Sequence, residues 1–370
     1  MCPQSCGQVH YDGRSFREAR WDAWCYQQNL AWPRLPSGRL DLRQQTFKDM
    51  AAIHPDVQPI KELRASLSQL RLHALQVGPD GRNRCLLSAF RAITSRNQPS
   101  TNKFIFGPAV WMRFLIQAQP EYGLAYIDYE QQEFGIAAVL ANDTAMIAAY
   151  CSADPYLEFA KQAGAAPPDA TRDTHEVIRN RFKTCALGVQ YGMESLSLAV
   201  RLGSSEAHAA ELLRYHRRTY PQFWWWSDNC LDTAMWTGYL TSCFGWRLHV
   251  GRRPNPRSLR NWPVQTHGAE MLRLACCYAT EAGIRVAAPV HDAVLIESPL
   301  ETLAQDATRM AKYMRQASAD VLQGFELRTE VKYFRAPERY SDKRGKAMWE
   351  TVNALLAQCE AGDITSRARV

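Results

Sequence analysis

The segment RVAAPVHDAVLIESP, residues 285 to 299, places one histidine and one aspartate between two apolar runs. Both runs, 286–290 and 293–296, have the composition of buried strands. An ionised aspartate inside a strand costs several kcal/mol unless it is paired, hydrated or bound to a metal. We therefore predict that His291 and Asp292 form the turn of a hairpin, where Asp292 is either solvated or projects into a cleft.

A second aspartate has a similar place in the sequence. Asp128 ends the alternating segment YGLAYIDY, which is typical of a strand, and a predicted helix with acid in its first turn follows. If Asp128 and Asp292 lie at neighbouring strand ends, their carboxylates and the backbone carbonyl of Tyr129 would bind two hard cations. Such ions stand roughly 3.5–4 Å apart and clamp an in-line phosphoryl transfer. Because many proteins have two strand-end aspartates, this pattern alone does not define the reaction.

A predicted basic helix narrows the choice of reaction. Residues 174–200 have helical spacing, with Thr174 as the predicted N-cap. Four side chains recur every four residues: Arg179, Lys183, Leu187 and Tyr191. Each step of four turns a helix by roughly 40°, so Arg179 and Lys183 project together. An arginine fork and a lysine charge can bind a triphosphate, and Tyr191 offers a flat surface for a base. The same spacing also suits a solvated basic face.

Other segments supply the elements that must position these residues. Helical apolar spacing covers residues 60–77, and a long helix is predicted for 261–282. Residues 241–251 are typical of a hairpin, whereas the segment PQFWWWSD, 221–228, predicts a turn with an aromatic cluster. Strands separated by helical blocks indicate an α+β or α/β fold.

The composition is that of a globular protein. The chain has 370 residues, of which 46% are hydrophobic and 22% charged, enough for two or three domains. A formal charge of +7 is compatible with a polyanionic partner. No apolar run reaches the roughly 18 residues of a membrane span. The 11 irregularly spaced cysteines and the absence of a signal-like start predict reduced thiols and a cytoplasmic location.

Taken in order, these motifs resemble those of the family-A DNA polymerases, the bacterial DNA polymerase I type. DYEQQE, 128–133, is similar to the first catalytic motif, D-Y-S-Q-I-E, and VHDAV, 290–294, to the H-D-E motif. The stretch R-x3-K-x7-YG of this chain, which begins at Arg179, is similar to the family's fingers-helix motif. RSLRNWPVQ, 257–265, matches R-x3-N-x-P-x-Q, and SRNQPSTN, 95–102, resembles the basic primer-binding turn. The resemblance runs through most of the chain.

The resemblance implies a role for each matched residue. Asp128 and Asp292, with the Tyr129 carbonyl, would hold two Mg²⁺ ions, which Mn²⁺ could replace, and Lys183 would donate a proton to pyrophosphate. Glu133 would fill the space that a 2′-hydroxyl needs. The deoxynucleotide (dNTP) would contact Arg179, Lys183, Leu187, Tyr191, Glu133, Gln132 and Tyr156. Primer-template DNA would contact Arg96, Asn97, Arg257, Asn261, Gln265 and His291.

Four positions depart from the family pattern. Ala293 replaces the second carboxylate of H-D-E, and we expect activity to survive this change. Glu130 stands where serine is usual and adds an acid beside Asp128. Leu187 replaces the usual Phe or Tyr beside the nucleotide sugar, a change that bears on discrimination against dideoxy nucleotides, and Tyr156 replaces a frequent His near the phosphates.

The resemblance also implies an architecture. We expect an α+β fold, with a polymerase palm of antiparallel sheet and helices and an inserted, mainly helical fingers subdomain. The expected division is a leading segment 1–40, palm 41–130, fingers 131–245, and palm with tail 246–370. A largely missing thumb and no exonuclease domain are expected, hence synthesis without proofreading. The chain would be a truncated product, or would work with another polypeptide that supplies a thumb or an exonuclease.

The predicted function is template-directed DNA synthesis from dNTPs on a primer-template. It would take place in the cytoplasm of a bacterial or phage-infected cell, at the nucleoid, in replication, repair or the copying of a mobile element. One alternative is a truncated relic that binds DNA without extending it. A single-subunit RNA polymerase is disfavoured by Glu133, and a two-metal nuclease would not need the helix of Arg179 and Lys183.

Overall fold

The computed structural model describes residues 10–12, 15–69, 75, 77–99, 104–107 and 109–361. The chain forms two compact units. One unit comprises Met1–Cys85, Thr101–Ile116 and Ser341–Val370, and the other comprises Leu86–Ser100 and Gln117–Tyr340. Every predicted site residue belongs to the second unit. The predicted division into leading segment, palm and fingers follows different boundaries and stays a prediction.

The first unit has its own small core. Its elements are β1 (Tyr11–Asp12), β2 (Ser15–Phe16), α2 (Glu18–Gln27), α3 (Gln44–Ile53), η1 (Pro55–Val57), α4 (Gln58–Gln69), η3 (Val110–Leu115), η4 (Lys343–Gly345) and α14 (Lys346–Glu360). Trp21, Trp32 and Phe47 are buried together, and the Trp21 and Trp32 rings meet edge to face at 4.9 Å. This aromatic cluster anchors α2 and α3, because aromatic side chains bury large areas at low entropic cost.

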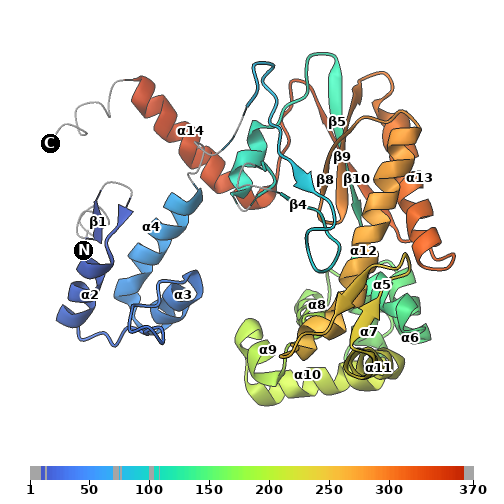
Figure 1. The fold of residues 1–370 in the computed structure, drawn as a ribbon, viewed down its shortest axis with the longest axis horizontal. Helices are drawn as coiled ribbons and strands as arrows, with labels where there is room; N and C mark the ends of the chain where they lie inside the picture. Colours follow the sequence, from blue (N-terminus) through green and yellow to red (C-terminus); the bar gives the residue numbers. More distant parts are fainter. Residues whose placement is uncertain are drawn as a thin grey trace. The chain divides into compact units, whose positions relative to one another are not determined.

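The second unit is built on a four-stranded antiparallel sheet. Its order is β10 (Thr329–Arg335), β5 (Tyr122–Tyr129), β9 (Ala293–Pro299) and β8 (Val286–Val290). The inner strands β5 and β9 are mostly buried, which their apolar composition predicts. Figure 1 shows α12 (Pro256–Glu281) and α13 (Leu303–Val321) running beside this sheet, and both contact its strands.

The helices between β5 and α12 form the rest of this unit. They are α5 (Gln132–Leu140), α6 (Thr144–Cys151), α7 (Pro155–Gln162), α8 (Glu176–Gln190), α9 (Ser195–Leu202), α10 (Glu206–Thr219) and α11 (Pro221–Thr237). Two small antiparallel pairs complete it: β3 (Leu87–Ser88) with β4 (Gln98–Pro99), and β6 (Tyr239–Thr241) with β7 (Arg247–His249). In Figure 1, α7 to α11 gather around one end of α12.

Several sequence predictions are confirmed. The strand ending near Asp128, the hairpin with His291 and Asp292 at its turn, the hairpin of β6 and β7, and the long helix α12 all form. The predicted helix 60–77 forms as α4, which ends at Gln69, and residues 70–74 and 76 lie outside the described residues.

Three local predictions are wrong. The helix predicted for 174–200 is two helices, because Gly192 adopts a φ of +66° between α8 and α9. Its N-cap is His175 rather than Thr174, whose hydroxyl bonds the side chain of Thr171 instead. The predicted turn at 221–228 is the start of α11, because Pro221 occupies the first helical turn, where its missing N–H has no cost.

Candidate active site and nucleic-acid interface

The two predicted aspartates lie side by side at one end of the inner strands. Asp128 is next to last in β5 and pairs across the ladder with Ala293, the residue after Asp292. The Tyr129 amide donates to the Asp292 carbonyl at 3.2 Å, so the turn and the strand end are tied together. His291 makes this tight turn possible by adopting a φ of +55°.

Burial raises the pKa of both carboxyl groups, and the charge of Asp292 adds to the rise at Asp128. The pKa of Asp128 is raised to about 7, first by burial and then by the charge of Asp292, which Lys332 partly offsets. Burial also raises the pKa of Asp292, with His291 and Arg96 acting in the opposite direction. Two carboxyl groups this close cannot both ionise cheaply unless a cation joins them.

The donor set fits hard divalent cations. Asp128 Oδ1 is buried without a hydrogen-bond partner, an arrangement that a bound cation would resolve. The described residues contain no group of three or more His, Cys, Asp or Glu side chains placed to hold a metal. Asp128 and Asp292 would therefore hold Mg²⁺ with only two carboxylates, the usual case where waters and substrate phosphates complete the coordination.

The unusual Glu130 has a partner that the sequence did not reveal. Arg328, just before β10, lies with its Nε 3.5 Å from the Glu130 carboxylate. The same guanidinium donates to the Ser152 carbonyl at 2.5 Å and to the Gln131 side chain at 3.3 Å, and it lies 4.9 Å from the Tyr150 ring. The extra acid is thus balanced by a cation that also holds the turn between β5 and α5.

The basic helix α8 presents its two cations as predicted. Arg179 and Lys183 lie over the ring of Tyr156, with Arg179 Cζ 5.6 Å and Lys183 Nζ 5.7 Å from its centroid. Arg179 Nε also pairs with Asp154 at 2.6 Å. Asp154 is the N-cap of α7 and accepts from the amides of Tyr156 and Leu157. Burial raises the pKa of Tyr156 to about 12, so its ring is neutral beneath the two cations.

A short polar chain links α5 to the end of α8. Tyr191 is half exposed, and its hydroxyl interacts with Glu133; burial first and Glu133 second raise the pKa of Tyr191. Arg96 reaches the same carboxylate at 3.5 Å. Gln132, in contrast, is buried against α12, where a Cβ on Gly268 would come within 2.7 Å of its Oε1. Glu133 and Tyr191 are therefore in contact, whereas Gln132 packs α5 against α12.

The other predicted nucleotide-binding residue on this helix, Leu187, is half buried on α8.

The loop that carries Arg96 and the exposed Asn97 is firmly anchored. The indole nitrogens of Trp246 and Trp262 both donate to the Ile93 carbonyl, at 3.2 Å and 2.7 Å. The Arg273 guanidinium donates to the Ser95 carbonyl, and Ser95 takes a φ of +57°. A left-handed serine costs free energy that these contacts offset, so the loop conformation that places Arg96 is specified.

The three polar residues predicted on α12 follow a spacing of four. Arg257 is exposed, and Asn261 and Gln265 are half buried along the same side of the helix. Arg257 pairs with Glu194 at 3.0 Å, and its stem packs on Gly192, where a Cβ would come within 2.8 Å of Arg257 Cγ. The break between α8 and α9 thus lies against the start of α12.

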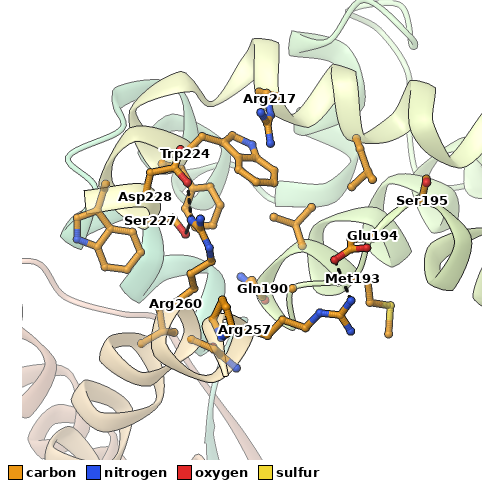
Figure 2. A pocket seen from close by; sticks show the side chains of 18 of the residues that line it. Gln190, Met193, Glu194, Ser195, Arg217, Trp224, Ser227, Asp228, Arg257 and Arg260 are labelled. Carbon is orange, nitrogen blue, oxygen red and sulfur yellow. Dashed lines mark hydrogen bonds and ion pairs between the residues drawn. The ribbon is translucent and has the colours of Figure 1, made fainter. Parts of the chain in front are cut away.

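A cavity of about 730 Å³ lies among α8 to α12, beside this break (Figure 2). Arg257 and Arg260 on its wall are paired with Glu194 and Asp228, as the dashed lines in Figure 2 mark. Arg217 instead lies 4.3 Å from the Trp224 ring centroid. The lining also includes Gln190, which is 7% exposed and has no hydrogen-bond partner for either side-chain amide atom. The unpaired amide of Gln190 is therefore available to a polar group that enters the cavity.

Sequence reasoning did not find Asp154, Arg328 or the cavity. An aspartate before a proline was a visible N-cap signal, but its second role toward Arg179 depends on how α7 packs against α8. Nothing near Arg328 in the sequence points to Glu130, which lies 198 residues earlier in the numbering.

Comparison with solved structures defines the class of fold. The polymerase domain of Pol1 from M. smegmatis, solved in a complex with DNA primer-template and dNTP, has a similar fold, with a TM-score of 0.69. The similarity covers 86% of this chain and 60% of that chain at 21% sequence identity. The mixed α+β fold is thus that of a DNA polymerase I polymerase domain, as predicted.

The family follows from the sequence. Residues 108–335 match the model of DNA polymerase family A, and the chain belongs to this family. DNA polymerase I of Deinococcus radiodurans is 30% identical over 211 residues, which cover 53% of this chain and 22% of that protein. The thermostable DNA polymerase I of Thermus aquaticus is 27% identical, and the DNA polymerase of Mycobacterium phage D29 is 29% identical. The matched part spans between about a fifth and a third of these relatives' length.

Among the described residues, no helix is long and apolar enough to cross a lipid bilayer. Cysteines fall at 9 described positions, and all of them are free thiols.

Proposed function

We propose that this chain catalyses template-directed DNA synthesis, transferring a nucleotidyl group from a dNTP to a primer 3′-hydroxyl. The observation that carries the proposal is the buried pair Asp128 and Asp292, in which burial raises both pKa values and Asp128 Oδ1 has no hydrogen-bond partner. Members of the family use divalent metal ions. Bound at this pair, Mg²⁺ would lower the pKa of the primer hydroxyl and neutralise phosphate charge.

The remaining residues would bind and orient the substrates. Arg179 and Lys183 would hold the triphosphate, and Lys183 would give a proton to the leaving pyrophosphate. Glu133 would close the space beside the sugar, since Tyr191 and Arg96 hold its carboxylate in place. The cavity between α8 and α12 would take an unpaired base, with Gln190 meeting its polar edge and the Trp224 ring beside it.

Duplex DNA would bind through residues on three elements of the same unit. Arg96 and Asn97 come from the anchored loop, His291 from the turn of β8 and β9, and a further set from α12: Arg257, Asn261 and Gln265. Side chains of this kind can read sugars, phosphates and the degenerate minor groove, so they suit an enzyme that accepts any sequence. We propose palm and fingers subdomains with the predicted boundaries; synthesis without proofreading and the need for a second polypeptide stay predictions.

The test is primer extension by the purified chain on a labelled primer-template at low salt, with Mg²⁺ and dNTPs. Wild type should add the nucleotide that the template specifies. Asp292→Asn, which keeps the side-chain shape, should lower the rate by about a thousandfold, since a metal clamp contributes several kcal/mol to such reactions. Asp320→Asn is the matched control, because it removes an exposed carboxylate that bonds only Tyr278 in the described structure.

Two results would contradict the proposal. Extension by Asp292→Asn at the wild-type rate would refute the metal assignment. A folded wild type that binds primer-template but never extends it would favour a relic that binds DNA without catalysis.

A further inference from the structure

The β6–β7 hairpin presents one face to solvent that none of the proposed contacts uses. Its two strands alternate cleanly: Leu240 faces Leu248 on one side, where Leu240 is buried against the core around Trp262. The other side carries two facing pairs, Tyr239 with His249 and Thr241 with Arg247, and all four residues are exposed. Trp236, in the last turn of α11 before the hairpin, is 92% exposed. We call these five residues the hairpin platform: Trp236, Tyr239, Thr241, Arg247 and His249.

Three groups of the platform, Tyr239, Arg247 and His249, are already assembled. The Arg247 guanidinium lies 4.9 Å from the centroid of the Tyr239 ring, and the His249 ring lies 6.3 Å from it. The Trp236 indole, three residues before Tyr239, is almost fully exposed, and exposed aromatic surface close in the chain can mark an interaction site. The planar groups of arginine, tyrosine and tryptophan all stack on flat partners.

The hairpin and the loop after it are basic in sequence, and the nearest acid, the exposed Asp232, lies one turn before Trp236 on α11. Between Asp232 and Glu270 the sequence contains no acidic residue but five arginines: Arg247, Arg252, Arg253, Arg257 and Arg260. Two of these are engaged elsewhere, by Glu194 and Asp228. Within the described parts of the chain, no carboxylate pairs with Arg247, Arg252 or Arg253. The platform therefore combines stacking surfaces with unneutralised cations, which is complementary to a polyanion that has exposed bases.

We propose that the hairpin platform binds single-stranded DNA, by stacking bases on Trp236 and Tyr239 and by phosphate contacts from Arg247, Arg252 and Arg253. Duplex DNA would leave the aromatic rings unused, because its bases are already stacked. The hairpin also joins the proposed duplex contacts, since Trp246 at its tip bonds the Ile93 carbonyl in the loop that carries Arg96. The strand bound would be the unpaired template, an identity that rests on the proposed function.

The experiment measures binding without metal or nucleotide. A labelled oligothymidylate of about 16 nucleotides and a blunt duplex of equal charge would be titrated with wild type, Trp236→Ala and Tyr239→Ala. Each substitution should weaken oligothymidylate binding by about 5- to 100-fold and duplex binding by less than about twofold. Arg252→Ala should lower the slope of log K against log salt for the oligonucleotide by about 0.7, one phosphate contact.

Trp225→Ala is the matched control. Trp225 is 66% exposed on the same helix, 11 residues before Trp236 and therefore about 16 Å away along the axis. The control should bind both ligands as wild type does. Unchanged oligothymidylate binding by Trp236→Ala and Tyr239→Ala would overturn the proposal, and so would an equal loss for the duplex or for Trp225→Ala.

These outcomes are separable from the fate of the proposed function. If wild type extends primers but the platform variants bind oligothymidylate normally, only the platform is refuted. If wild type binds oligothymidylate through the platform but does not extend primers, only the synthetic activity is refuted.

Discussion

The candidate site has an acidic half, Asp128 and Asp292, and a cationic half, Arg179 and Lys183. The two halves differ in which charges lie next to their own. Asp128 and Asp292 face each other at the end of the sheet, and each pKa is raised first by burial. On α8, by contrast, Arg179 is already paired with Asp154 at 2.6 Å and lies with Lys183 over the Tyr156 ring. The acidic half brings two like groups together, whereas the cationic half pairs its arginine with a carboxylate.

Because of this difference, a divalent cation at the carboxylates and a triphosphate at α8 would gain different amounts of binding free energy. A divalent cation would relieve the repulsion between the two carboxylates, so cation binding stabilises the folded sheet end. A triphosphate gains less from α8, because part of the charge of Arg179 is already compensated. Arg179 binds Asp154 through Nε, which leaves its two terminal nitrogens toward other partners, one of them Asn180 at 3.2 Å. Asp154 therefore orients the guanidinium fork rather than blocking it.

Removing the arginine or its partner tests this distinction, and removal of the arginine should have the larger effect of the two. Arg179→Ala should raise the KM for dNTPs by about 10- to 100-fold, because charge-assisted hydrogen bonds contribute roughly 1.5–3 kcal/mol. Asp154→Asn, which can still cap α7, should raise it by only about three- to tenfold with kcat little changed. Steady-state kinetics on a fixed primer-template measures both. A KM that falls in Asp154→Asn would mean that Asp154 competes with the nucleotide.

The acidic pair can be tested without any substrate. The pKa of Asp128 is raised from 3.8 to about 7 in the folded chain, so the fold binds this proton more tightly than the unfolded chain does. Stability from this group is therefore complete below about pH 4 and is lost as the pH rises toward and through 7. Asp128→Asn should melt higher than wild type at pH 8 and nearly equally at pH 4, by about 2–4 °C for each kcal/mol of relieved repulsion.

Added Mg²⁺ provides the control for that melting experiment. It should raise the melting temperature of wild type at pH 8 and close the gap to Asp128→Asn, because the cation replaces the missing proton. Equal melting temperatures at both pH values would show that the two carboxyl groups do not repel each other in the fold.

The sequence predicted this site better where local pattern decides structure than where packing decides it. Asp128 and Asp292 were found because alternation and apolar runs define strands and their ends. The four-residue spacing of Arg179 and Lys183 likewise survives in α8. The break at Gly192 was missed, since a glycine inside helical spacing is tolerated in many helices. The helix beginning at Pro221 was read as a turn, although proline is also common at N1.

Contacts between distant segments were beyond the sequence. Arg328 reaches Glu130, Ser152 and Tyr150 only because β10 lies next to β5 in the sheet. Gln132 carries a family role by resemblance, yet its side chain is buried against Gly268. Periodicity gives the face of an element that a residue occupies, and only the packing of whole elements gives its neighbours.

The last prediction concerns the pair of Arg328 and Glu130, which extends the comparison to an acid paired directly with a cation. Arg328→Ala should slow primer extension by about tenfold and cost roughly 1–3 kcal/mol of stability, since it leaves the Ser152 carbonyl without its donor and Glu130 without its ion-pair partner. Arg328→Lys should recover only part, because an ammonium cannot make the contacts of a planar fork. Glu130→Ser in the Arg328→Ala background should restore extension if the unbalanced charge beside Asp128 causes the loss. A double-mutant cycle on the extension rate measures this, and strictly additive effects would show that Glu130 and Arg328 act independently.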